Sequence, residues 1–358
     1  MTSIRAGFEL QAEACESLGS PLTARLCRLA ALRLDTSTAV GERILSWPGD
    51  ASHRGDAVAL RLMGGLHRAV LSGRAPSLKA AYAAPELFSD AAFWQLISEV
   101  LEQQQPLLME VLNSPPQTNE VRRSTALAAI GHWLARRFDL PLVISELGAS
   151  AGLNLFWNDW RIETPSGPLG PPEAPVTLTP EWRGKAPERG LVRVAAKGGV
   201  DLSPLDPLAD REKILSYVWA DQQDRLIRTA AALDHVAGTS VRVEQGDAVD
   251  WLEERLAKPP KGTVHLVCHT IAWQYFPEAL RARAERLLTE AGAQASREAP
   301  LARFAMEGDG GDLPGAALTL DLWPEGRRMD FGRADFHGRW IDWQPPSPAA
   351  VGREEEAG

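Results

Sequence analysis

The stretch that most constrains the fold is residues 140–154, which read L-P-L-V-I-S-E-L-G-A-S-A-G-L-N. Its apolar run stops at Glu146, and small residues then occupy 148–152. Leucine and aromatic residues recur at helix-like spacing over 153–157. This order predicts a buried strand, a tight glycine turn and the first turn of a helix. Because such a turn brings free backbone N–H groups close to a ligand, we expect a binding site here.

The residues before this stretch predict helices alone. Apolar residues recur at three- and four-residue steps near the N-terminus, and prolines separate the periodic segments. Further helices are expected over roughly 56–72, 86–104 and 120–137. No alternating strand pattern occurs in this part of the sequence. The sequence therefore predicts an all-helical N-terminal cap domain over 1–139.

The residues from 140 to 344 predict an α/β core. A Pro- and Gly-rich insertion occupies about 160–190, and the chain from 345 to 358 is expected to be a disordered tail. The alternation of strands and helices predicts a doubly wound, Rossmann-like parallel sheet with a C-terminal antiparallel hairpin. The expected strands are 141–146, 191–195, 240–244, 263–268 and 301–306, with helices at 208–236, 249–256 and 278–291 and hairpin strands at 317–323 and 335–343.

Composition limits the partners of the protein. The chain has 358 residues and a formal net charge of −9, without the basic stripe of a nucleic-acid binder. Its three cysteines are scattered, which predicts a reducing compartment and no disulfide framework. The N-terminal residues contain no long apolar segment, so no secretory leader is expected, and no apolar run in the sequence could span a bilayer. We therefore expect a cytoplasmic protein that acts on a small molecule, with no nucleic-acid or membrane partner and an oligomeric state that the sequence leaves open.

The candidate site residues follow the predicted strands, because a doubly wound sheet binds its ligand at the carboxyl ends of the strands. They are Glu146, the 148–152 turn, Asp201, Asp247 and His269. Each has a structural alternative: the three acids can cap backbone amides, and the histidine can be a hydrogen-bonded residue at a strand end. No metal site is predicted, since His265 and His269 lie four residues apart without further ligands.

Taken in order, these strand ends resemble those of the class I S-adenosylmethionine-dependent methyltransferases. The resemblance covers roughly 140–343 and implies S-adenosylmethionine as the cofactor. It implies that Glu146 supports the methionine amine, that the glycine turn cradles the amino-acid end, that Asp201 binds the ribose and that Asp247 contacts the adenine. The implied cofactor-binding residues are Glu146, Gly148, Ser150, Gly152, Asn154, Asp201, Asp247, Ala248 and His269.

The sequence departs from that family pattern at three places. The fourth strand lacks an Asn-Pro-Pro-Tyr-type motif, so a nitrogen in a nucleobase or amide is not indicated as the methyl acceptor. Ser150 stands where the family has its middle glycine, so a side chain enters the space where the cofactor approaches the backbone. The gap from Gly152 to Asp201 is about fifty residues, against the ~20 usual for a ribose-binding acid.

Catalytic and substrate-binding residues are expected around the mouth of the same site. His269 is the candidate general base, because it follows the fourth strand. Glu120 and Arg123 open the helix before the glycine turn and are further catalytic candidates, with a helix cap as the structural alternative. The substrate-side candidates are Asn119, Trp273, Tyr275 and His337.

Two other functions stay open. The sequence G-A-S-A-G also fits the G-x-S-x-G nucleophile elbow of α/β-hydrolases, with Ser150 as the nucleophile. Asp247 and then His269 or His337 would follow in the required order, but no H-G-G-G-type oxyanion loop precedes the elbow. The other alternative is a non-catalytic protein that binds an adenosine ligand.

The whole chain is also similar to an uncharacterised bacterial family, domain of unknown function 2332. This similarity implies no reaction. The matching phrases are Q-T-N-E-V-R-R-S, E-L-G-A-S-A-G-L-N-L, V-W-A-D-Q-Q-D-R-L, H-T-I-A-W-Q-Y-F-P and G-R-A-D-F-H-G-R-W.

Overall fold

The computed structural model describes residues 3–52, 55–258 and 261–346, and the chain divides into two units. The first unit contains the chain up to Thr118 together with Leu208–Ala230. The second contains Asn119–Pro207 and the chain from Ala231 onward. Both units are therefore built from two separate pieces of the sequence.

The first unit is helical, as predicted. No strand occurs among its described residues. Its elements up to Thr118 are α1 (Ile4–Ser17), α2 (Pro21–Arg33), α3 (Ala39–Leu45), α4 (Val58–Leu71), α5 (Pro76–Ala83), η1 (Pro85–Leu87), α6 (Asp90–Gln103) and α7 (Gln105–Leu112).

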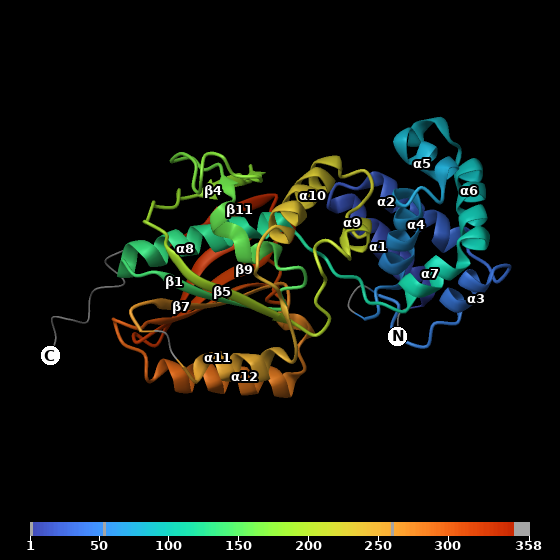
Figure 1. Cartoon of the computed structure of the whole chain (residues 1–358). Helices are drawn as coiled ribbons and strands as arrows, with labels where there is room; N and C mark the ends of the chain where they lie inside the picture. Colours follow the sequence, from blue (N-terminus) through green and yellow to red (C-terminus); the bar gives the residue numbers. More distant parts are fainter. Residues whose placement is uncertain (1–2, 53–54, 259–260, 347–358) are drawn as a thin grey trace. The chain divides into compact units, whose positions relative to one another are not determined.

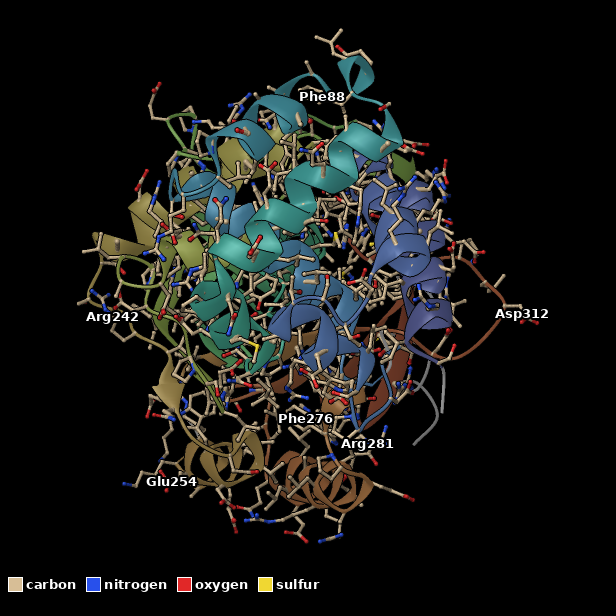
Figure 2. The ribbon with its side chains drawn as sticks, turned by 90° about the vertical axis from the view of Figure 1, so that its right-hand side faces the viewer. Phe88, Arg242, Glu254, Phe276, Arg281 and Asp312 are labelled. Atoms are coloured by element: carbon tan, nitrogen blue, oxygen red, sulfur yellow. The ribbon has the colours of Figure 1, made fainter. Side chains whose placement is uncertain are left out.

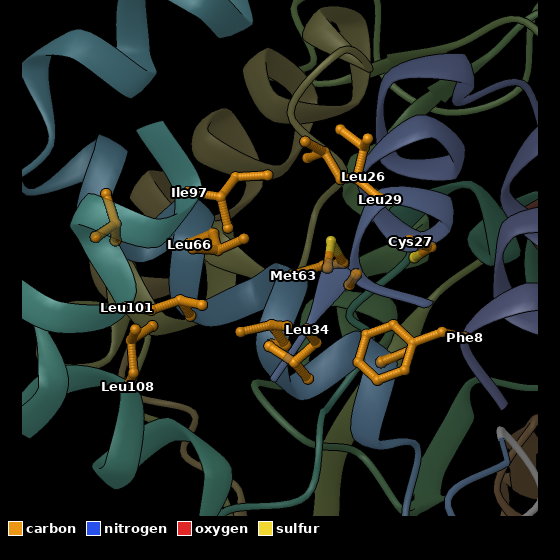
Figure 3. Packing of buried hydrophobic residues seen from close by; sticks show 14 of the residues in the cluster. Phe8, Leu26, Cys27, Leu29, Leu34, Met63, Leu66, Ile97, Leu101 and Leu108 are labelled. Carbon is orange, nitrogen blue, oxygen red and sulfur yellow. The ribbon is translucent and has the colours of Figure 1, made fainter. Parts of the chain in front are cut away.

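Helix α4 lies at the centre of this unit. Leu66 and Met63 on α4 pack among leucines of α2, α6 and α7 in one buried cluster (Figure 3). Two glycines let other elements approach the helix closely. A Cβ at Gly64 would lie 2.7 Å from the Tyr217 ring, and a Cβ at Gly65 would lie 2.7 Å from the Leu108 side chain.

The prediction of a single helix over 208–236 is wrong. The structure has two helices, α9 (Arg211–Ser216) and α10 (Gln223–Ala237), with a turn between them. The turn carries Asp221, whose carboxylate accepts hydrogen bonds from the Ser20 hydroxyl and from the Leu22 amide at the start of α2. These contacts hold the turn to the start of α2.

The second unit contains a nine-stranded, mostly parallel sheet (Figure 1). The five consecutive parallel strands are β6-β5-β1-β7-β8, which is the order 3-2-1-4-5 when these strands are numbered along the chain. Antiparallel β9, β10 and β11 follow β8, and β4 pairs in parallel with β11 at the edge. The strands are β1 (Leu142–Leu147), β4 (Glu181–Gly184), β5 (Val194–Asp201), β6 (Glu244–Gln245), β7 (Val264–Thr270), β8 (Leu301–Glu307), β9 (Ala316–Trp323), β10 (Arg327–Ala334) and β11 (Trp340–Trp343).

Helices cover both faces of this sheet. α11 (Ala248–Leu256) and α12 (Glu278–Gly292) pack on one face, and α8 (Ser124–Phe138) lies on the other (Figure 1). Glu254 on α11 projects to the solvent side of its layer (Figure 2). Because strand residues alternate between faces, side chains from one strand can take part in two separate networks.

The crossover from β1 to β5 differs from the prediction. Instead of an α-helix, the glycine turn leads into the 3₁₀ helix η3 (Leu153–Asp159) and then into β2 (Arg161–Ile162), β3 (Thr177–Leu178) and β4. The insertion expected at about 160–190 thus supplies short strands. One of them, β4, extends the main sheet.

Strand β5 was expected at 191–195 but runs to Asp201. The misleading feature is Gly198-Gly199, which resembles a turn in the sequence. In the structure Gly199 lies in the strand, and a Cβ there would approach the Ala149 Cβ to 2.7 Å. The glycine is needed because the 148–152 loop packs against the strand at this point.

Two other strand predictions need correction. β6 is limited to Glu244–Gln245, shorter than the expected 240–244 strand and shifted toward its end. The predicted C-terminal hairpin is a three-strand meander, because β10 lies between the two expected segments. β10 alternates only weakly between buried and exposed residues, which explains why its sequence was taken for a connection.

The predicted domain boundary at 139 falls after α8, whereas α8 belongs to the second unit. The helix packs against η3 and β8 of that unit. Most of the expected tail, from residue 347 onward, lies outside the described residues. None of the helices in the described part of the chain has the length and apolar character needed to cross a bilayer.

Candidate functional site

The loop after β1 has an unusual backbone. Gly148, Ser150 and Gly152 all have positive φ, at 72°, 52° and 74°. Gly148 and Gly152 adopt this conformation readily, whereas Ser150 is strained. The loop also packs closely, since a Cβ at Gly148 would lie 2.7 Å from the Ala272 Cβ and one at Gly152 would lie 3.0 Å from Val243.

The expectation that this loop offers free N–H groups to a ligand is wrong. All five amides from Gly148 to Gly152 donate to acceptors within the protein, over 2.7–3.1 Å. The loop is therefore held by its own hydrogen bonds, and recognition must come from side chains around it. The acceptors are Val200 O for the first two amides, followed by Asp201 Oδ2, Asn119 Oδ1 and Ala149 O.

Glu146 lies at the end of β1, 3% exposed, and its Oε2 has no hydrogen-bond partner in the described chain. Burial raises the pKa of this carboxyl to about 8, although the Arg123 charge acts to lower it. The Asp201 carboxylate raises it further. Glu146 is thus a buried carboxylic acid that would lose its proton when a cationic ligand group binds beside it.

Arg123 and Asn119 hold separate loops at this edge of the sheet. Arg123 donates to Thr270 O at the end of β7, over 3.1 Å, and to Phe336 O in the turn before β11, over 3.0 Å. Asn119 donates to Ser150 Oγ and accepts from the Ala151 amide, both over 3.1 Å. Asn119 therefore positions the 148–152 loop, whereas Arg123 positions the segments after β7 and before β11.

Glu120 and Asn154 make local structural contacts. The Glu120 carboxylate accepts from the Arg122 amide over 3.0 Å at the start of η2 (Val121–Arg123), which is the cap that the sequence left as an alternative. The Asn154 side chain accepts from Ser124 Oγ over 2.7 Å and ties η3 to α8.

Asp201 and Asp247 both bind backbone amides. Asp201 lies at the end of β5 and accepts from Ser150 N and Ser203 N, each over 2.9 Å. Asp247 caps α11 through Val249 N at 2.8 Å and Asp250 N at 3.2 Å, with Ala248 as the first residue of the helix. Asp247 is therefore the N-cap of α11, the structural alternative that the sequence left open for this residue.

His269 is not at the mouth of the site. It is fully buried, its Nδ1 lies 2.8 Å from Glu307 Oε1, and its Nε2 accepts from Arg303 Nε over 3.2 Å. Burial lowers the pKa of this histidine. It faces the α11–α12 side with Trp273, whereas neighbouring Cys268 interacts with Glu146. The alternation of side chains along β7 therefore separates His269 from the predicted site.

The remaining substrate-side candidates are dispersed. Trp273 stacks on His269 with ring centroids 4.8 Å apart, and the Arg303 guanidinium lies 4.3 Å from the Trp273 ring, so this indole is part of the packing. Tyr275 is 68% exposed. His337 lies in the turn whose Phe336 carbonyl contacts Arg123.

A cavity of about 150 Å³ adjoins the glycine loop. Its lining includes Gly152, Leu205 and Val243, from the segments after β1, after β5 and before β6. Ligand pockets usually measure roughly 300–1,000 Å³, so this one accommodates part of a nucleoside-sized ligand. Within the described residues, no group of three His, Cys, Asp or Glu side chains is arranged to hold a metal ion.

Glu307 is the residue that the sequence interpretation missed. It ends β8, and its Oε1 also accepts from the amides of Ala272 and Trp273, over 3.0 and 3.1 Å. It therefore fixes the segment that packs on Gly148. The sequence pattern that identified Glu146 could also have identified Glu307. In both cases an acidic residue lies at the end of an apolar strand, just before a glycine-rich loop.

Comparison with known proteins shows the family of the chain. The sequence model of the family described as "Uncharacterized protein conserved in bacteria (DUF2332)" matches residues 5–343. The chain therefore belongs to this family. No match was found among curated proteins or among solved structures.

Proposed function

We propose that the second unit binds S-adenosylmethionine and transfers its methyl group to a small molecule. The strand order 3-2-1-4-5, followed by antiparallel β9, supports a Rossmann-like fold of the class I methyltransferase type. Glu146 near the end of β1, the glycine loop and Asp201 at the end of β5 converge at one edge of that sheet. This set of residues is the reason for preferring a nucleoside cofactor.

The observation that carries the proposal is the buried Glu146 carboxyl with its unpartnered Oε2. A buried polar atom without a partner is costly, and a cationic ligand group would satisfy it. The ammonium of S-adenosylmethionine fits this requirement. Asp201 fits the ribose, because each of its oxygens accepts one amide and retains a lone pair for a hydroxyl.

Bound S-adenosylmethionine would supply an activated methyl group. The chain's own residues would orient it and exclude water. Glu146 Oε2 would lose its proton as it pairs with the ammonium. Asn119 and Asp201 would hold the loop, and Arg123 would fix the ends of the neighbouring segments. His269 is not assigned as the base, because both of its ring nitrogens are engaged.

The serine-hydrolase alternative is supported only by the strained φ of Ser150. Its Oγ accepts a hydrogen bond from the Asn119 amide, which cannot act as a base. Asp247, the acid in either proposed triad, caps α11, and His269, one of the two candidate histidines, binds Glu307. Methyl transfer is therefore the preferred proposal.

Calorimetric titration with S-adenosylmethionine and S-adenosylhomocysteine tests the proposal. We expect both to bind, and Asp201→Ala to weaken binding by about tenfold or more, because it removes a charge-assisted hydrogen bond. Asp139→Ala, at the amino end of β1, is the matched control and should leave binding unchanged. The absence of heat with either ligand would exclude the proposed function.

Ser150→Ala separates the two enzyme classes. A hydrolase would lose turnover of an ester substrate completely, because its nucleophile is removed. The proposed methyltransferase would keep its affinity for the cofactor within a few-fold, since the substitution removes the hydrogen bond from Asn119 but none of the bonds made by the loop amides.

A further inference from the structure

Residues 270–273, at and just beyond the end of β7, pack on the loop that follows Glu146. Glu146 of β1 pairs in register with Cys268 of β7, and partners in a parallel pair point to the same face of the sheet. Beyond the strand ends, the Ala272 side chain lies against Gly148, where an added Cβ would come within 2.7 Å of the Ala272 Cβ. The segment 270–273 therefore borders the space that encloses the Glu146 carboxyl.

A ligand cannot reach this carboxyl in the present conformation. Glu146 is 3% exposed, and its Oε2, the atom proposed to pair with an ammonium, is buried. The 148–152 loop is held by the hydrogen bonds of its five amides, so it resists displacement. The segment 270–273 is the neighbouring part of the chain whose movement would open a path to Oε2.

The backbone of this segment is strained at Ile271. Its φ is 52°, in the left-handed region that a β-branched residue rarely adopts. Such conformations persist only where the surrounding structure imposes them, and they concentrate at binding sites and switch regions. Movement of the segment would release this strain.

Charged residues on two sides hold the strained segment in place. Glu307 Oε1 accepts hydrogen bonds from the amides of Ala272 and Trp273, over 3.0 and 3.1 Å. Arg123 donates to Thr270 O over 3.1 Å. Hydrogen bonds to ionised groups are stronger than those between neutral groups. These contacts stabilise the closed position, and the backbone strain opposes them.

We propose that residues 270–273 form a gate, which opens to admit a cationic ligand group to Glu146 and is closed by Glu307 and Arg123. This role rests on the proposed function, because it concerns access to the carboxyl that would receive the cofactor ammonium. Opening breaks the hydrogen bonds that the two closing residues make to the segment. The gate should open for a small fraction of the time even without a ligand.

Cys268 reports this opening, because it is 1% exposed and lies on the Glu146 side of β7. The native full chain is treated with iodoacetamide, and mass spectrometry of the cysteine peptides distinguishes Cys268 from Cys15 and Cys27. We expect Cys268 to be labelled at a rate that hardly changes at low urea concentration, because local opening exposes little surface. A rate that rises with urea as steeply as global unfolding does would overturn the proposal.

Two substitutions at Ile271 test the strain. Ile271→Gly and Ile271→Ala both remove the branched side chain, but only glycine adopts a positive φ readily. The closed gate should therefore be more stable in the glycine variant, and its Cys268 should be labelled about fivefold more slowly than in the alanine variant. Equal rates in the two variants would contradict a strained gate.

Glu307→Gln tests the closing contacts. It replaces the carboxylate with a neutral amide, so Cys268 should be labelled about tenfold faster than in the wild type, the change expected for loss of a charge-assisted hydrogen bond. Glu290→Gln, an exposed position on α12, is the matched control and should leave the rate unchanged. An unchanged rate in Glu307→Gln would overturn the proposal.

Saturating S-adenosylmethionine separates the gate from the proposed function. Bound cofactor should slow the labelling of Cys268, because the gate closes over it. Labelling that responds to the substitutions but not to S-adenosylmethionine would support the gate and exclude this ligand. Cofactor binding in a protein whose labelling responds to none of the substitutions would support the function and exclude the gate.

Discussion

Glu146 and Glu307 each end a buried strand of the sheet, but their surroundings give them opposite properties. Burial acts to raise the pKa of Glu307, but the hydrogen bond and charge of His269, with the amides of Ala272 and Trp273, lower it overall. Glu146 lacks such donors, and burial raises its pKa to about 8. Glu307 is therefore a structural anion, and Glu146 is an acid suited to receive a cation.

The buried carboxyl of Glu146 should make the stability of the protein depend on pH. Between its ordinary pKa of 4.5 and about 8, the folded state keeps this proton and the unfolded state releases it. Stability from this group is therefore present at low pH and is lost as the pH rises through this range. Glu146→Gln lacks the titration, so its stability relative to wild type should rise by on the order of a few kcal/mol between about pH 5 and about pH 8.

Urea unfolding of both proteins across this pH range measures the effect. Glu290→Gln, an exposed position on α12, is the control and should show no such trend. A difference between Glu146→Gln and wild type that stays constant with pH would contradict the assignment.

The three hydrogen bonds of Glu307 Oε1 should make this residue important for stability. Glu307→Ala leaves buried His269 and two amides without their acceptor, which should cost about 2–4 kcal/mol. Thermal unfolding measures the loss, with Glu290→Ala as the surface control. Equal melting temperatures for the two variants would show that water replaces these contacts.

At the scale of elements, much of the fold could be predicted from the sequence. The strongly apolar strands β1, β7 and β8 lie within a residue or two of their expected limits, because burial on both faces gives a continuous hydrophobic run. β5 was misplaced because its two glycines serve close packing rather than a turn. The extent of β5 depends on tertiary contacts, which a local sequence pattern does not contain.

The candidate site was predicted in location more than in detail. Glu146, Asp201 and Asn119 do meet at the glycine loop. His269 was expected just past the fourth strand, but β7 runs to Thr270, two residues beyond its expected limit. His269 therefore lies within the strand, where the register decides which face its side chain occupies. The hydrogen bonds that close the loop come from residues far apart in the sequence, so they could not be predicted from it.

The glycine loop allows a matched test of close packing. Gly148 and Gly310 both have φ of 72°, but a Cβ at Gly148 would meet Ala272, whereas one at Gly310 would meet no described atom within 4 Å. Both alanine variants should lose about 1–2 kcal/mol from the backbone conformation. Gly148→Ala should lose roughly 1–3 kcal/mol more through overpacking, as measured by urea unfolding. Equal losses would show that Ala272 moves aside freely.

At the scale of the whole molecule, each unit depends on a distant piece of the chain. The segment 208–230 returns to the first unit, and Asp221 supplies the cap that Ser20 does not give to α2. Asp221→Ala should destabilise this unit by about 0.5–2 kcal/mol. Hydrogen exchange of the Leu22 amide should become faster, whereas the exposed Asp224→Ala control should leave it unchanged. Unaltered exchange in Asp221→Ala would refute this role.

The central claim is that Glu146 receives the cationic end of S-adenosylmethionine. Titration calorimetry at about pH 7 in two buffers of different ionisation enthalpy measures the protons released on binding. Because Glu146 is protonated at this pH and would ionise on pairing, the wild type should release close to one proton per cofactor bound, and Glu146→Gln should release none. Binding with equal proton release in both proteins, or no binding by the wild type, would contradict the account.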